Sequence, residues 1–257
     1  MNAPARRLRI AHLYPRLMNI YGDRGNILCL TRRCRARGID VEVTELGLGE
    51  RLDSNTHDLI FIGGAQDREQ RRVAEDLRTV KGEALREAVE SGVVALAVCG
   101  GYQLFGKLYR ESTGAELQGL GLFDLWTEHP GPDAERLVGN VIAELEPDPN
   151  DGWRGGTLAG FENHGGRTHL GPQAQPLARV RSGAGNNGRD GTEGARYKNA
   201  FGTYLHGSLL PKNPRFADRL IALALAHHGD DRELDAIDDR LEEAAHRAAL
   251  RLTGRRR

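Results

Sequence analysis

The sequence predicts an α/β fold with a mostly parallel sheet flanked by helices and with antiparallel additions in its C-terminal half. Short apolar runs of strand length recur early in the chain, at residues 8–13, 41–43, 59–62 and 93–98. Between them, apolar residues recur at helical spacing, as around 27–34 and 84–89. Strands that alternate with helices are typical of parallel sheets with covered faces and right-handed crossovers.

After residue 115 the segments become shorter and are punctuated by glycine, which predicts antiparallel strands at 121–126, 137–145, 157–162, 178–180 and 200–205. Residues 182–194 are nearly all turn formers and predict a mobile hairpin tip without a packed role. Helical spacing returns over 214–252, which predicts two C-terminal helices, 214–228 and 232–252. No linker or internal repeat interrupts the chain, so residues 1–257 are predicted to form a single domain.

Composition excludes several classes of function. The chain has 36 lysines and arginines against 36 aspartates and glutamates, so no overall charge attracts it to nucleic acid or anionic lipid. Its three cysteines have no CxxC spacing, and the N-terminus lacks the apolar stretch of a signal peptide. The longest apolar runs, such as 93–98, are far shorter than the roughly 18 residues of a membrane span. These features predict a soluble protein of the reducing cytoplasm.

The most informative stretch is VVALAVCGGYQLFG, residues 93–106, in which a buried strand runs directly into Cys99. Gly100 and Gly101 leave room for the tight strand-to-helix turn of a nucleophile elbow. At such a turn, unpaired helix amides favour the thiolate, and the Gly100 amide could donate to an oxyanion. The alternative is that Cys99 is a small buried apolar residue. Cys29 and Cys34 lie in a predicted helix without such glycines and are interpreted as structural.

A second strand ends in paired glycines in DLIFIGGAQ, residues 58–66. The carboxyl ends of parallel strands meet at one edge of the sheet, where ligands bind. A backbone amide at Gly64 or Ala65 could therefore face that of Gly100 across the thiol, and Gly64 with Gly100 forms the predicted oxyanion site. Without Cys99, the same glycines would indicate only a strand-to-helix turn.

The predicted general base is His206, in YLHGSLLPKNP at residues 204–214, where a strand releases the histidine into a loop held by two prolines. Cysteine and histidine that are distant in sequence but close in space can generate a thiolate and protonate a leaving amine. His164, in GFENHGGR, is the second choice for this role.

These motifs resemble class I glutamine amidotransferase domains, specifically their cobyric-acid-synthase-like branch, across nearly the whole chain. CGGYQLFG, GGAQD and YLHGSLLPKNP carry the resemblance to the branch. Within it, LYPRLMNIYGDRGN, GGAQDREQ and GFENHGGRT are similar to the GatD subfamily of glutaminase subunits. The resemblance implies a flavodoxin-like sheet.

The resemblance also implies a reaction and a partner. Cys99 would attack the side-chain amide of glutamine, form a glutamyl thioester and release ammonia. A MurT-like Mur ligase subunit would use ATP and magnesium to activate the D-glutamate of lipid II, which ammonia converts to D-isoglutamine in peptidoglycan synthesis. This chain has no P-loop match, so the ATP step is expected on the partner, which also reaches lipid II; neither a cofactor nor a metal is expected here.

The family further implies an arginine for the glutamine carboxylate, which matches Arg136 in DAERLVGN, with Arg167 in NHGGRT as the alternative. One departure concerns the base. Typical class I enzymes carry a glutamate two residues after the histidine, whereas Ser208 stands there in this chain. A backbone carbonyl, Ser208 or a carboxylate such as Glu162 could orient His206 instead.

A weakly oriented base predicts slow hydrolysis by the isolated subunit. Two other functions stay open on the sequence alone. One is the amidation of cobyrinate-type cofactors, which shares the chemistry but changes the acceptor. The other is a catalytically weak subunit that only stabilises a ligase, which the missing acid would explain.

Overall fold

The first sheet follows the predicted alternation of strands and helices in the computed structural model, which describes residues 6–148 and 153–253. It has six strands in the order β13-β14-β4-β3-β1-β2, and only the β13–β14 pair is antiparallel. The strands are β1 (Arg7–Leu13), β2 (Asp40–Leu46), β3 (Leu59–Ile62), β4 (Val94–Val98), β13 (Ala195–Tyr197) and β14 (Ala200–Thr203).

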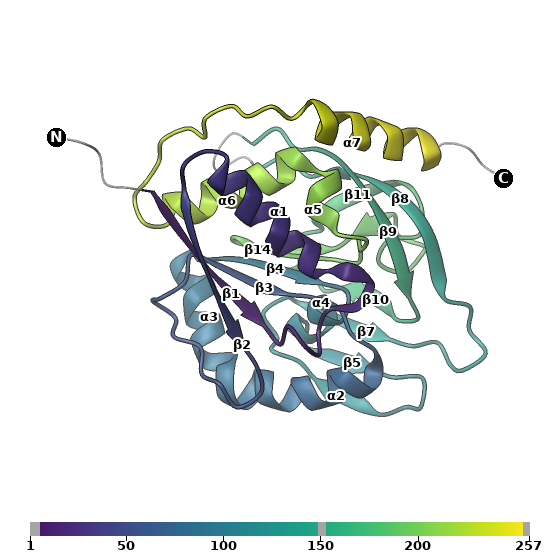
Figure 1. The fold of residues 1–257 in the computed structure, drawn as a ribbon. Helices are drawn as coiled ribbons and strands as arrows, with labels where there is room; N and C mark the ends of the chain where they lie inside the picture. Colours follow the sequence, from purple (N-terminus) through teal and green to yellow (C-terminus); the bar gives the residue numbers. More distant parts are fainter. Residues whose placement is uncertain (1–5, 149–152, 254–257) are drawn as a thin grey trace.

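Helices cover both faces of this sheet, with α1 and α6 on one face and α2 and α3 on the other (Figure 1). This placement explains why β4 reads VALAV without alternation, since all five residues are buried. The helices are α1 (Arg24–Arg35), α2 (Asp67–Asp76), α3 (Gly82–Ser91), α4 (Gly100–Phe105), α5 (Leu209–Lys212), α6 (Pro214–Ala226) and α7 (Arg240–Thr253), with a 3-10 turn η1 (Ile20–Gly22) and a π-helical turn η2 (Leu77–Lys81).

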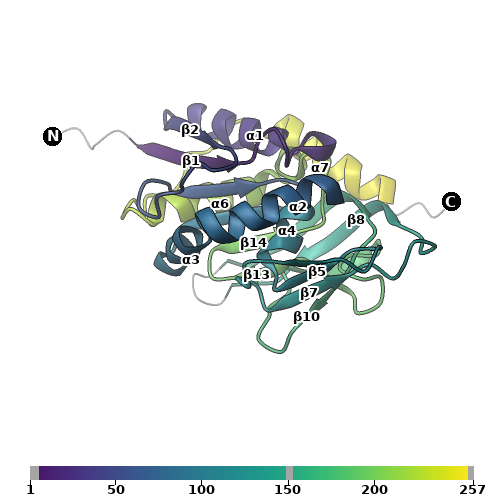
Figure 2. The same cartoon turned by 90° about the horizontal axis from the view of Figure 1, so that it is seen from below.

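The antiparallel strands of the C-terminal half form two further four-stranded sheets, so most of them do not extend the first one. The sheet β10-β7-β5-β6 is marked by β5, β7 and β10 in Figure 2. It contains β5 (Leu108–Arg110), β6 (Glu116–Gln118), β7 (Leu125–Glu128) and β10 (Arg167–Leu170). The sheet β12-β11-β8-β9 contains β8 (Leu137–Leu145), β9 (Gly156–His164), β11 (Ala178–Ser182) and β12 (Thr192–Glu193). β14, predicted as antiparallel, pairs parallel with β4 because the chain returns to the first sheet by a crossover.

The prediction of a mobile tip without a packed role at residues 182–194 is wrong. Asn186 is fully buried; it accepts a hydrogen bond from the Tyr102 hydroxyl at 3.0 Å and donates to the Gly194 carbonyl at 3.0 Å. The backbone amides of Ala184 and Gly185 both donate to Glu162 at 2.8 Å. Side chains thus supply the hydrogen bonds that a strand would make, and the turn-forming residues build an ordered, packed loop.

The second C-terminal helix begins later than predicted, at Arg240 instead of residue 232. Two arginines, Arg33 of α1 and Arg37 just after it, hold the segment before α7: Arg37 donates to the Asp235 carbonyl at 2.6 Å, and Arg33 donates to the Asp239 carboxylate at 2.6 and 2.7 Å. No helix in the described part of the chain is both long and apolar enough to span a membrane.

The carboxyl ends of β1, β3, β4 and β14 meet at one edge of the first sheet because these strands are parallel. The segments that follow them carry Asp23, Gly64, Cys99 and His206 respectively. The topology therefore brings together residues that are up to 183 positions apart in sequence.

Candidate active site

Cys99 occupies the strand-to-helix turn between β4 and α4, which confirms the predicted local geometry. Its φ of 49° lies in the left-handed region, a strain of about 1–3 kcal/mol for a residue with a side chain. Two hydrogen bonds hold the turn: the Cys99 amide donates to the Thr203 carbonyl at 2.8 Å, and the Gln103 amide donates to the Cys99 carbonyl at 2.9 Å. The neighbouring strand β14 thus fixes the position of the thiol, which is only 7% exposed.

The two glycines after Cys99 are required by close packing. A Cβ on Gly100 would lie 2.8 Å from the side-chain nitrogen of Gln70 and 3.0 Å from the Ala65 amide nitrogen. A Cβ on Gly101 would lie 2.9 Å from the Gly63 carbonyl oxygen. The turn after β4 therefore packs directly against the turn after β3, as the paired glycines predicted.

The prediction that Gly64 supplies an oxyanion donor is wrong, because its amide already donates to Asp23 Oδ2 at 2.7 Å. The neighbouring Ala65 amide, the alternative to Gly64, is placed differently. It faces the Gly100 turn, and Ala65 lines the same cavity as Cys99. Within residues 6–148 and 153–253, neither the Ala65 nor the Gly100 amide donates a hydrogen bond. Gly64 itself is needed for space, since a Cβ there would lie 2.7 Å from His206 Cε1.

His206 is completely buried beside Cys99 and is held from two directions. Its amide donates to the Phe161 carbonyl at 2.7 Å, which anchors the loop after β14 to β9. Its ring nitrogen Nδ1 donates to Asp23 Oδ1 at 3.2 Å. The opposite nitrogen, Nε2, is buried without a hydrogen-bond partner in the described part of the chain and is the atom left to exchange a proton with the thiol.

Asp23 is the orienting group that the sequence did not reveal. It is fully buried at the start of α1, and each of its carboxylate oxygens has a partner, the Gly64 amide and the His206 ring. The only local signal was the polar turn Gly22-Asp23-Arg24-Gly25, which also fits an ordinary helix start.

The two side chains predicted to orient His206, Ser208 and Glu162, form hydrogen bonds with other groups. The Ser208 hydroxyl donates to the Gly22 carbonyl at 2.8 Å, and Glu162 accepts from two amides of the 182–194 loop. Neither Ser208 nor Glu162 is therefore the orienting group. Ser208 instead ties the loop after β14 to the loop that carries Asp23.

The surroundings of His206 favour the protonated form of its ring. Burial lowers the pKa of His206, but the negative charges of the Cys99 thiolate and the Asp23 carboxylate outweigh it and raise that pKa to about 10. Burial raises the pKa of both Cys29 and Cys34 to about 12, so these two thiols stay protonated at neutral pH. Their interpretation as structural agrees with this difference.

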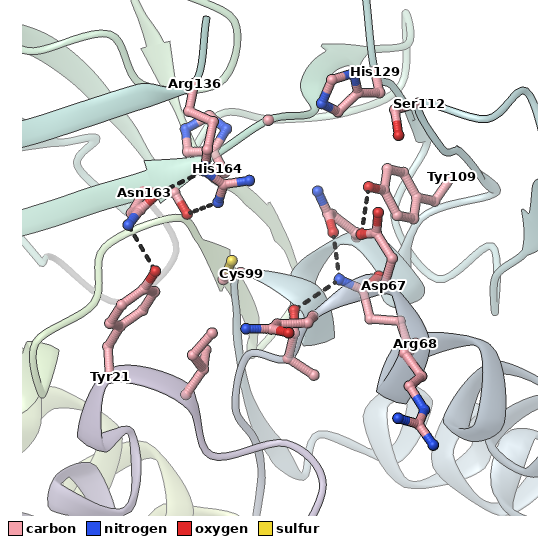
Figure 3. Close-up of a pocket in the computed structure, with 16 residues that line it drawn as sticks. Tyr21, Asp67, Arg68, Cys99, Tyr109, Ser112, His129, Arg136, Asn163 and His164 are labelled. Carbon is pink, nitrogen blue, oxygen red and sulfur yellow. Dashed lines mark hydrogen bonds between the residues drawn. The ribbon is translucent and has the colours of Figure 1, made fainter. Parts of the chain in front are cut away.

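Cys99 opens into a cavity of about 530 Å³ (Figure 3). Arg136 lines this cavity, whereas Arg167 does not. The guanidinium of Arg167 is directed to the carbonyls of Gly165 and Glu135, both at 2.7 Å. The structure thus brings Arg136, the first choice for the carboxylate of glutamine, to the site. The lining residues are Ile20, Tyr21, Ala65, Gln66, Asp67, Arg68, Gln70, Cys99, Gln103, Tyr109, Ser112, His129, Arg136, Asn163, His164 and Gly165.

His164 forms part of the cavity wall and does not take the place of His206. Its ring stacks on Tyr204 with centroids 3.6 Å apart, and Nδ1 donates to the Gly166 carbonyl at 2.8 Å. Burial lowers its pKa, so the ring is neutral. Among the described residues, no group of three or more histidine, cysteine or acidic side chains is placed to hold a metal ion.

Known proteins resemble this chain in sequence and in fold. Residues 9–214 match the model of the CobB/CobQ-like glutamine amidotransferase domain. The chain is 41% identical to "Lipid II isoglutaminyl synthase (glutamine-hydrolyzing) subunit GatD" of Staphylococcus aureus, with 91% of each chain covered. It is 40% identical to the subunit of the same name from Streptococcus pneumoniae, with 92% of this chain and 88% of that relative covered.

More distant relatives share only part of their length or only the fold. The cobyric acid synthase of Nocardia farcinica is 36% identical over 162 residues, which cover 59% of this chain but 29% of that protein. A crystal structure of a glutamine amidotransferase superposes with a TM-score of 0.56 at 15% identity, covering 83% of this chain and 98% of that one. That likeness supports the fold alone.

Proposed function

The chain belongs to the CobB/CobQ-like glutamine amidotransferase family, and from this premise we propose that it hydrolyses the side-chain amide of L-glutamine and supplies the ammonia to a ligase subunit. The observation that carries the proposal is the line of three buried side chains, Cys99, His206 and Asp23, at the edge of the parallel sheet. It provides a nucleophile, an acid–base group and a carboxylate that orients the imidazole.

The first half of the reaction forms a thioester. The Cys99 thiolate attacks the amide carbon of glutamine, and the Ala65 and Gly100 amides bind the oxygen as it becomes negative. The His206 imidazolium gives its Nε2 proton to the amide nitrogen, the carbon–nitrogen bond breaks, and ammonia leaves.

The second half regenerates the enzyme. Neutral His206 takes a proton from water as the water attacks the thioester, and glutamate and the Cys99 thiolate are released with His206 again protonated. The net change is glutamine plus water to glutamate plus ammonia. Asp23 touches no reacting atom and acts through His206, as the positioning residue that keeps Nε2 directed at the sulfur.

We further propose that the acceptor of the ammonia is the D-glutamate of lipid II, activated with ATP and magnesium by a MurT-like Mur ligase partner in the cytoplasm. The two GatD relatives match this chain over about nine tenths of their length, whereas the cobyric acid synthases align over about a third of theirs or less. This difference in coverage favours the cell-wall reaction over cofactor amidation. The Asp23–His206 contact disfavours a subunit that has lost its chemistry.

The test of the hydrolase is the substitution Cys99→Ala. We expect glutamate release from glutamine to stop while the melting temperature and partner binding are retained. Persistence of glutaminase activity in this variant would show that the nucleophile is another residue. The acceptor is tested by co-purifying the chain with its partner from the native cell and assaying lipid II for amidation; a partner that amidates a corrinoid would overturn the cell-wall proposal.

A further inference from the structure

Gln70 is a buried polar residue of α2 that the proposed mechanism does not use. Only 2% of its surface is exposed, and it lines the cavity of Cys99. Its Nε2 donates to the Ala65 carbonyl at 3.2 Å and to Gln103 Oε1 at 3.0 Å. Ala65 belongs to the turn after β3, and Gln103 belongs to α4, which follows the turn at Cys99. One side-chain amide thus joins the segments that follow two neighbouring strands.

Hydrogen bonds fix the peptide groups on both sides of the Ala65 α-carbon. The Gly64 carbonyl, in the peptide group that carries the Ala65 N–H, accepts from the Ile20 amide at 3.1 Å. The Ala65 carbonyl, in the next peptide group, accepts from Gln70. Peptide groups are planar, so holding both of them gives the Ala65 N–H a single direction.

Gln70 also packs against the turn that carries the second oxyanion donor. A Cβ on Gly100 would lie 2.8 Å from Gln70 Nε2 and 3.1 Å from its Cδ. A backbone hydrogen bond, from the Gly101 amide to the Gly63 carbonyl at 3.1 Å, already links the two turns one residue further on. Gln70 adds a second link, at Ala65 and Gly100 themselves.

The partner of Gln70 on α4 is held in turn by the interior of the protein. Gln103 Nε2 donates to the Tyr204 hydroxyl at 3.1 Å, and that hydroxyl lies 2.6 Å from the Thr168 hydroxyl. All four side chains of this chain of hydrogen bonds are buried. Away from water each bond is stronger, and a missing partner costs more, so the Gln103 oxygen stays directed at Gln70.

We infer that Gln70 is a positioning residue, which sets the separation of the Ala65 and Gly100 amides so that both reach one oxygen atom of the tetrahedral intermediate. Two donors stabilise the same oxygen only when each lies about 2.7–3.1 Å from it, so a small shift of one turn loses a bond. The inference rests on the proposed glutaminase function and adds to it the side chain that couples the two halves of the oxyanion site.

The first test replaces Gln70 with methionine, which fills a similar volume but cannot donate to the Ala65 carbonyl or to Gln103. We expect kcat for glutamate release to fall about tenfold, less than the roughly 10²–10³ lost when an oxyanion donor itself is removed, and KM to stay within about twofold. A Gln70→Met variant with wild-type kcat would overturn the inference.

Val73→Ala is the matched control for this substitution. Val73 is fully buried on the same helix but does not line the cavity. Its truncation should lower the melting temperature and leave kcat near that of the wild type. Equal losses of kcat in the two variants would mean that the packing of α2, and not the Gln70 amide, determines activity.

The second test uses an aldehyde, 5-oxopentanoate, whose carbonyl carbon corresponds to the amide carbon of glutamine. The Cys99 sulfur adds to this carbon and the carbonyl oxygen gains the thiol proton, which forms a thiohemiacetal with no leaving group. Its oxygen takes the place of the oxyanion, so Gln70→Met should weaken inhibition by about the same tenfold as it lowers kcat. Wild-type inhibition of this variant would overturn the inference.

Iodoacetamide separates positioning of the oxyanion donors from positioning of the thiol. Its reaction forms a sulfur–carbon bond and releases iodide without placing a negative charge on a carbonyl oxygen. Gln70→Met should therefore be alkylated at Cys99 at the wild-type rate. If iodoacetamide and the aldehyde lose reactivity equally, Gln70 only maintains the position of Cys99, and the inference is wrong.

Tyr204→Phe is a second variant, which removes only the hydroxyl that holds Gln103 Nε2. It should lower kcat and aldehyde inhibition together, by less than Gln70→Met does. All measurements use the full chain with its native partner. A wild-type complex that binds the aldehyde but releases no glutamate from glutamine would refute the proposed function, whereas a complex that hydrolyses glutamine regardless of Gln70 would refute the inference alone.

Discussion

Cys99 and Cys34 are both buried thiols without a disulfide, yet their surroundings differ. Cys34 lies on α1, where burial raises its pKa to about 12 although the charges of Arg37 and Arg33 oppose this. Cys99 lies beside a histidine whose own pKa is raised to about 10 by the thiolate and by Asp23. Nearby arginines are therefore not enough to offset burial. What distinguishes Cys99 is a neighbouring histidine that is itself held by a carboxylate, and on this difference our proposal that Cys99 is the nucleophile rests.

The largest effect on this contrast between Cys99 and Cys34 is expected when the Asp23 carboxylate is removed. Asp23→Asn leaves His206 without its oriented acceptor, and we expect kcat for glutamate release to fall by about 10³–10⁴-fold, as when the acid of a catalytic triad is replaced. Ser208→Ala is the control. Its hydroxyl bonds to the Gly22 carbonyl and not to the ring, so kcat should stay within about twofold of wild type. Equal losses in both variants would mean that loop order, and not the Asp23 carboxylate, determines activity.

A smaller loss of kcat is expected when a new side chain crowds Cys99 and His206. In Gly64→Ala, the new Cβ would lie 2.7 Å from His206 Cε1 and 3.1 Å from Cys99 Cβ. The two side chains must separate, and a shift approaching 1 Å costs about a hundredfold in rate. Gly139→Ala serves as the control, because a Cβ there meets no atom within 4 Å. A Gly64 variant with wild-type kcat would show that the pair is less closely packed than these distances indicate.

Selective alkylation measures the contrast directly. The raised pKa of His206 keeps its ring protonated up to a pH of about 10, and a cation beside a thiol favours its nucleophilic form. Cys29 and Cys34, by contrast, should react appreciably only as the pH approaches their pKa of about 12. At pH 7 we expect Cys99 to react more than about a hundredfold faster than either, as measured by mass spectrometry of labelled peptides. Comparable rates for the three thiols would contradict activation of Cys99 by His206.

The same contrast explains how much of the site the sequence could reveal. Cys99 and Gly100 were predictable because a strand-to-helix turn is encoded by adjacent residues. Asp23 was not, because its contact with His206 joins residues 183 positions apart and the aspartate looks like an ordinary helix start. The prediction of Gly64 as an oxyanion donor failed for the same reason, since the Gly64 amide donates to Asp23.

The fold shows the same division between local and distant causes. Alternating strands and helices predicted the parallel sheet, whose register depends on apolar runs. The predictions for the loop 182–194 and for the start of α7 were wrong because side chains from elsewhere hold those segments, namely Glu162, Arg33 and Arg37. Composition describes what a segment can form alone, and it cannot include partners contributed by a distant part of the chain.

The smallest expected effect concerns a second buried acid, Glu193, and it concerns stability instead of rate. Glu193 lies behind the site, where Oε1 accepts from the Thr203 hydroxyl at 3.0 Å and from the Tyr204 amide at 2.8 Å, while Oε2 has no partner in the described part of the chain. Asp23 differs because both of its oxygens are bonded. Burial raises the pKa of Glu193 from 4.5 to about 7, so the folded state binds its proton more tightly than the unfolded chain does.

The sign of the pH dependence follows from this difference. Between pH 4.5 and about 7 the unfolded chain loses the Glu193 proton first, so the free energy of unfolding falls as pH rises, by at most about 3 kcal/mol for this shift. Glu193→Gln keeps an oxygen acceptor for Thr203 and Tyr204 but cannot ionise. Its melting temperature should therefore decline less than that of the wild type between pH 5 and pH 7.5. Glu243→Gln, a surface change on α7, should follow the wild-type curve. If the Glu193 variant also follows it, Glu193 is ionised throughout this range and the unpartnered oxygen is solvated.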